Sequence, residues 1–179
     1  DGVSDYALSV AKTFSAHIMG TAFYPAIVGG VDLSANFIRA QQAEARKHAE
    51  SVATAFDEAT RRAGVSAETR RIEAGIGDVP TQFAHIARRF DLSVIGQFER
   101  DRDHRTTNIV IEAALFESGR PVLIVPFIQK DRLKLDHVMV CWDGSRAATR
   151  AIADAMPFLT RSGKTSIAIA DTQSAKSTD

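Results

Sequence analysis

Three consecutive residues, Asp143, Gly144 and Ser145, form a polar turn directly after the apolar segment 137–142. Ligands of parallel sheets bind at the carboxyl ends of the strands, so this turn is a candidate ligand site. The same residue types also make an ordinary strand-to-helix turn in which Ser145 is the N-cap. Both interpretations of the turn stay open on the sequence alone.

A second group of polar residues lies between Glu99 and Thr106, where four basic side chains alternate with Asp101 and Asp103. The basic residues could clamp an anion, but the carboxylates between them cancel much of their field. A solvated loop is therefore the favoured interpretation.

Other common catalytic patterns are absent from the sequence. The five histidines have no metal-ligand spacing and no cysteine partners, and no Gly-x-Ser-x-Gly elbow occurs. Cys141 lies inside a predicted buried strand, so we expect an inert core thiol. We therefore expect no metal site and no catalytic residue of the hydrolase kind.

The segments that carry these residues alternate between predicted helices and predicted strands. The periodicity predicts helices over 3–15, 35–63, 108–117 and 146–159, with another following Asp78, and strands over 17–23, 67–73, 92–95, 121–125, 137–142 and 165–170. For the long helix we expect Ser34 as N-cap, Gly64 as the stop, and a core stripe of Val52, Phe56, Ala59 and Ala63. Several strands are continuous apolar runs, which is typical of a parallel sheet covered on both faces. The pattern predicts the doubly wound α/β class.

Composition excludes several classes of protein. The 179 residues carry 22 basic and 22 acidic side chains, so no net positive field attracts nucleic acid. No apolar run reaches the about 18–20 residues that span a membrane. The single cysteine fits a reducing compartment, and we expect a cytoplasmic protein.

The chain contains an internal repeat. Asp1-Gly2-Val3-Ser4 precedes a helix and strand 17–23, and Asp143-Gly144-Ser145 precedes a helix and strand 165–170. In the second copy an apolar strand comes before the turn. We therefore expect a first domain over 1–129 that lacks its first strand, a linker over 130–136, and the beginning of a second domain over 137–179.

Three segments resemble the universal stress protein family. The segment VMVCWDGSRAATRAIADAMPFL is similar to that family's opening strand, turn and helix, GRPVLIVP to its closing strand, and DLSVIG to its fourth strand. The resemblance implies a tandem protein of the Rossmann-like, adenine nucleotide alpha hydrolase-like kind, with a five-stranded sheet of order 3-2-1-4-5 in each domain. It also implies pairing as a homodimer, or as a pseudo-dimer of the tandem domains.

The family's ATP-binding members resemble Gly-x2-Gly-x9-Gly-(Ser/Thr) after strand four. Gly96 fits the first glycine, but Glu99 and Ile109 stand at the second and third. We therefore expect the first domain not to bind ATP. In the second domain Asp143 matches the family's strand-one aspartate, which is placed to hydrogen-bond a nucleoside.

Three functions follow as hypotheses. The first is a universal stress protein-like regulatory module of the stress response, without robust catalysis, that binds ATP or another nucleotide in the second domain. The candidate cofactor-binding residues are Asp143, Gly144, Ser145 and Gly96. The second is a nucleotide-hydrolysing or adenylating enzyme of the same α/β group. The third is a structural scaffold that dimerises through the apolar segment PVLIVPFI.

A domain without its first strand would have an empty position at the centre of its sheet, with unpaired backbone groups on both sides. Strand 137–142 is a chemically similar candidate to fill it. We expect instead that residues before Asp1 and after Asp179 exist.

Overall fold

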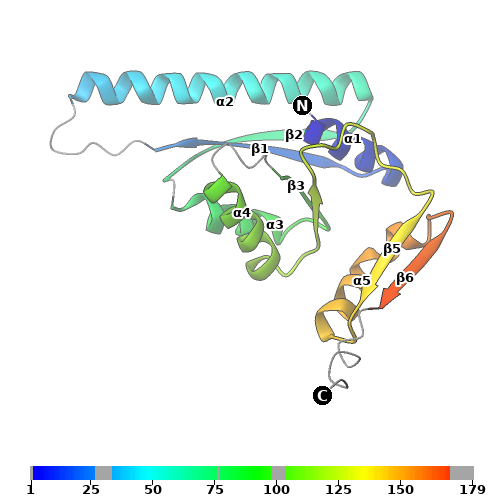
Figure 1. Ribbon diagram of the computed structural model, residues 1–179. Coiled ribbons are helices and arrows are strands. Elements are labelled where there is room, and N and C mark those ends of the chain that lie inside the picture. The colour runs from blue at the N-terminus through cyan, green and yellow to red at the C-terminus, as the bar shows by residue number, and fades with distance from the viewer. Residues whose placement is uncertain (1, 27–33, 76, 98–103, 170–179) are drawn as a thin grey trace, which may run out of the picture. The chain divides into compact units, whose positions relative to one another are not determined.

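The computed structural model describes residues 2–26, 34–75, 77–97 and 104–169 (Figure 1). It divides into two compact units, Asp1–Arg132 and Leu133–Asp179. The first unit contains α1 (Gly2–Phe14), β1 (Ile18–Pro25), α2 (Ala35–Ala63), β2 (Ala67–Ala74), α3 (Val79–Ala87), β3 (Ser93–Gly96), α4 (His104–Glu117) and β4 (Val122–Val125). The second contains β5 (Val138–Trp142), α5 (Arg146–Leu159) and β6 (Thr165–Ile169).

Helices alternate with parallel strands, which confirms the α/β class. The predicted five-stranded sheet of order 3-2-1-4-5 is not seen. The described strands form three separate parallel pairs, β1 with β2, β3 with β4, and β5 with β6. The physical reason is that, among the described residues, no strand lies beside the second edge of β1 or of β3, so nothing joins the first two pairs into one sheet.

The long helix α2 begins and ends where its capping residues predict. The Ser34 side chain accepts a hydrogen bond of 3.2 Å from the Phe37 N–H, and Gly64 takes a left-handed conformation with φ 66°. Three residues of the predicted core stripe, Phe56, Ala59 and Ala63, are partly buried, but Val52 is wrong because it is 49% exposed. The fully buried residues of the helix are Ala49, Ala53 and Thr60.

Small residues let α2 lie close to the strands it covers. Gly20 of β1 lies under the ring of Phe56, where a Cβ atom would come within 2.8 Å of Phe56 Cδ1. With Ala49 and Ala53 buried on the helix side, the α2 backbone packs directly on β1 and β2.

Helix α1 packs against both α2 and β3. It buries one apolar face made of Ala7, Leu8, Val10 and Ala11. Its first turn lies at the carboxyl end of β3, where a Cβ atom on Gly96 would clash with Val3 Cγ2. Gly96 is therefore required here for the close approach of α1 to β3.

We predict that Gly64→Ala lowers the free energy of unfolding by about 1 kcal/mol or more, because an alanine is strained at φ 66°. Gly77→Ala is the matched control. At both positions an added Cβ meets no atom within 4 Å, but Gly77 does not have a positive φ. Urea denaturation of both variants measures the difference. Equal effects of the two substitutions would contradict the assignment of Gly64 as the C-terminal cap.

Candidate functional site

The second unit carries an open hollow of about 510 Å³ at the carboxyl ends of its two strands. It lies where β5 passes into α5, the position at which ligands of parallel sheets bind. Its lining combines a polar turn with apolar side chains, and includes Trp142, Asp143, Ser145, Ala148, Ala151 and Ile169. The structure thus brings two of the predicted site residues, Asp143 and Ser145, to one hollow.

Hydrogen bonds fix the turn at the mouth of this hollow. Asp143 Oδ1 accepts a bond of 2.9 Å from the Ser145 N–H. Ser145 Oγ accepts a bond of 3.0 Å from the Ala148 N–H, which confirms Ser145 as the N-cap of α5. Between them Gly144 has φ 76°, a conformation that favours glycine. Each of the three residue types is therefore needed by the turn itself.

The carboxyl group of Asp143 is exposed and held in its ionised form. The Ser145 hydroxyl, followed by the Ser145 backbone N–H, lowers the pKa of Asp143 below its ordinary value. Hydrogen bonds to a carboxylate favour its charged form, which can only accept hydrogen bonds. Near neutral pH this side chain is therefore an acceptor for ligand hydroxyl or amino groups.

Two donors remain at the start of α5. In the described part of the chain no hydrogen bond satisfies the backbone N–H groups of Arg146 and Ala147. Such N–H groups at a helix N-terminus favour an anion, although the neighbouring Asp143 carboxylate opposes one that comes close. The site can thus accept hydrogen bonds from one part of a ligand and donate hydrogen bonds to another part.

The apolar wall of the hollow was missed by reasoning from the sequence. Trp142 lines the hollow together with Ala148 and Ala151 of α5. The strongly amphipathic sequence of α5 could have indicated this wall, because it predicts an apolar face on the helix. In the described structure α5 has no fully buried residue. Cys141, expected to be a buried core thiol, is exposed, because nothing in the described second unit covers that position of β5.

Gly96, the remaining predicted site residue, belongs to the first unit and does not line this hollow. It is buried, and Val3 occupies the space beside it. Ile109, at the position of the family's third glycine, lies inside helix α4, and Glu99 and Asp1 lie outside the described residues. In the described residues nothing around Gly96 forms a glycine loop.

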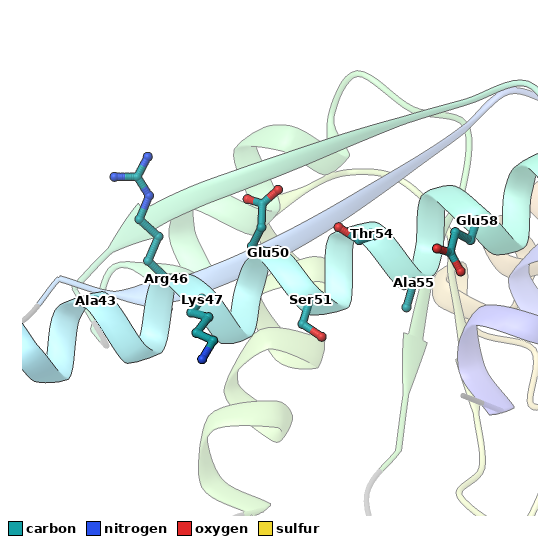
Figure 2. A pocket seen from close by; sticks show the side chains of 8 residues that line it. All are labelled: Ala43, Arg46, Lys47, Glu50, Ser51, Thr54, Ala55 and Glu58. Carbon is teal, nitrogen blue, oxygen red and sulfur yellow. The ribbon is translucent and has the colours of Figure 1, made fainter.

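A second hollow, of about 720 Å³, follows the surface of α2. All of its lining residues come from that one helix, between Ala43 and Glu58. Figure 2 shows Arg46 and Glu50 pointing to one side of the helix and Lys47 and Ser51 to the other. Glu50 is already engaged in an ion pair of 2.7 Å with Arg71 on β2. This surface does not direct its polar groups at a common ligand.

Two further searches of the described residues gave no site. None of their His, Cys, Asp and Glu side chains gather in groups of three or more that could hold a metal ion. Within the same ranges, no helix combines the length and the apolar character needed to cross a bilayer.

No model of a protein family matches this chain, and no curated protein is similar to it in sequence.

We predict that Ser145→Ala raises the pKa of Asp143 toward its ordinary value, because the hydroxyl that stabilises the carboxylate is lost. A lowered pKa in the folded state stabilises the fold above the pKa of the unfolded chain, and that contribution disappears as the pH falls through the folded-state pKa. NMR titration of the Asp143 side-chain carbon measures the shift. The control is Thr149→Ala, which removes a hydroxyl that donates to the Ser145 carbonyl instead. An unchanged pKa in Ser145→Ala would contradict the arrangement.

Proposed function

We propose that this protein is a binding module of the universal stress protein type, acting in regulation of the stress response. Its ligand is an adenine nucleotide such as ATP, held by the second unit. The observation that supports the proposal is the hollow after β5, where an ionised carboxylate, an apolar wall and unsatisfied backbone N–H groups occur together. These are the three kinds of partner that a nucleoside phosphate requires.

The chemistry of the hollow suggests how such a ligand lies. The Asp143 carboxylate accepts hydrogen bonds from the ribose hydroxyls or the exocyclic amine. Trp142 and Ile169 offer apolar surface to the base. Because the charge on Asp143 repels phosphate, the phosphates extend away from it, toward the N–H groups of Arg146 and Ala147.

The same observations favour binding over turnover. A general base works best when its pKa lies near the operating pH, and the pKa of Asp143 is lowered instead. We therefore propose a regulatory role without robust catalysis for the second unit. For the first unit we propose no nucleotide binding, since Val3 fills the space beside Gly96.

We predict that Asp143→Asn weakens ATP binding by about tenfold or more, because asparagine can keep the bond to the Ser145 N–H but loses the charged acceptor. Isothermal titration calorimetry of the full chain measures the affinity. The matched control is Asp154→Asn, the same change on α5 at a residue that pairs with Arg150 at 2.9 Å and does not line the hollow. Binding that is absent in the wild type, or equal in both variants, would refute the proposed site.

A second function is supported by the first unit, in which large apolar side chains are exposed near β4. The Phe116 side chain is 83% exposed and that of Ile128 is 70% exposed, and Ile124 and Phe127 are also exposed. Strand β4 pairs only with β3 among the described strands, so its other edge is open. We propose that this edge and its apolar side chains pair two chains as a homodimer.

We predict that Phe127→Lys converts the dimer to a monomer at micromolar concentration, because it places a charge in the apolar contact. Analytical ultracentrifugation measures the state. Phe37→Lys is the control, since the Phe37 side chain on α2 is exposed to a similar extent, 50% against 52% for Phe127. A wild type that stays monomeric at every concentration would exclude this pairing.

A further inference from the structure

Helix α2 has a stripe of exposed residues on the side opposite to its buried face. The buried residues are Ala49, Ala53 and Thr60, on the side that packs on β1 and β2. Because each residue of a helix is turned by about 100° from the one before it, the opposite side can be read from the sequence. Six exposed residues lie there, and we call them the outer stripe: Glu44, Lys47, Ser51, Ala55, Glu58 and Arg62.

The charges of the outer stripe are complementary to themselves when the order is reversed. From the N-terminal end they are negative, positive, two uncharged residues, negative and positive. Against an antiparallel second copy, Glu44 therefore lies opposite Arg62, and Lys47 lies opposite Glu58. The neighbouring Arg61 adds positive charge at the Arg62 end. In a parallel arrangement every charge would meet a like charge, which is unfavourable, so the pattern favours the antiparallel one.

One two-fold axis brings both pairs of opposite charges together. Glu44 and Arg62 lie on the same side of the helix, because the 18 residues that separate them make about five turns. Their midpoint is Ala53, and the midpoint of Lys47 and Glu58 is only about 0.75 Å away along the helix. The two small residues of the stripe, 51 and 55, share the midpoint at Ala53 and lie where the two helices come closest. A two-fold rotation about this point therefore forms both kinds of ion pair twice.

The charges of the outer stripe are not neutralised within the first unit. In the described part of the chain, none of its four charged side chains takes part in an ion pair or a side-chain hydrogen bond. Two carboxylates on a neighbouring side of α2 are engaged instead. Glu50 pairs with Arg71 at 2.7 Å, and Asp57 accepts a hydrogen bond from Thr69 Oγ1. Figure 2 shows Lys47 pointing away from the side of Glu50.

We propose that α2 is a contact surface through which two copies of this chain pair in antiparallel orientation along the outer stripe. The partner is a second copy because the stripe is complementary to itself and carries no large apolar side chain that another partner would bury. Exposed ion pairs each contribute little in water and are screened by salt, so the contact forms at about 0.1 mM chain and low ionic strength. This concentration is above the micromolar range in which pairing through β4 is tested. The contact uses neither β4 nor the hollow of the second unit, so it does not rest on the proposed function.

Cross-linking of the full chain at about 0.1 mM with a carbodiimide, which joins an amine to a carboxylate without a spacer, tests this contact. Within one helix Lys47 and Glu58 are 11 residues apart, about 16.5 Å along the axis, which is farther than their side chains can bridge. A Lys47–Glu58 amide found by mass spectrometry of the digested protein therefore joins two chains. We expect this link at low ionic strength, and a yield lower by about fivefold or more in about 1 M NaCl.

Two charge reversals leave both linked residues unchanged and test the antiparallel register. Glu44→Lys and Arg62→Glu each place like charges opposite each other, and each lowers the yield of the Lys47–Glu58 link by about fivefold or more. The combined variant restores opposite charges and returns the yield to within about twofold of the wild type. The matched control is Arg46→Glu, because Figure 2 shows the Arg46 side chain on the other side of the helix from Lys47. It changes the yield by less than about twofold.

A link that falls in each single variant and returns in the combined one supports the proposal. Absence of the link in the wild type, yields in the single variants equal to that of the wild type, or a combined variant as low as the single ones overturns it. The salt dependence needs no variant and gives a separate test. A yield that about 1 M NaCl leaves unchanged also overturns the proposal, because the contact would then not depend on these charges.

Discussion

The arrangement of this protein depends on the way a parallel strand pair divides its backbone groups. Each pair satisfies half of the groups of its two strands and directs the other half to the outer edges. In the first unit that division leaves the outer groups of β1 and β3 without strand partners among the described residues. Helix α1 contacts β3 and leads into β1, and the close approach of Val3 to the buried Gly96 brings its first turn to the carboxyl end of β3. The same division leaves one edge of β5 without a strand partner among the described residues of the second unit.

Local chemistry made much of the fold predictable from the sequence. Ser34, Gly64 and Ser145 cap helices because their side chains, or the lack of one, suit the conformation at a helix end, and this depends on few neighbours. Burial was harder to predict. Val52 is exposed and Ala53 is buried. Packing on β1 and β2 decides this, because small residues let α2 come close to the strands. The size of the sheet was also not predictable, since it depends on which strands meet.

The candidate site divides along the same line. Asp143 and Ser145 could be singled out because their spacing suits a strand-to-helix turn and because the resemblance to the universal stress protein family points to Asp143. The structure shows the turn with its bonds in place. The apolar wall, including Trp142 and Ile169, comes from side chains far apart in the sequence and depended on the pairing of β5 with β6. The exposure of Cys141 likewise depends on which elements cover the strand. A local pattern of residues does not predict this.

The central claim is that, in the part of the chain that the structure describes, β1 is paired along one edge only. Amide hydrogen exchange of the chain alone, resolved by residue, tests it most directly. The account predicts an alternation along β1, in which the amides of Gly20 and Ala22, bonded to β2, exchange slowly, and those of Thr21 and Phe23 exchange fast. Equal and strong protection of all four amides would contradict the account, because a strand would then already occupy the open edge.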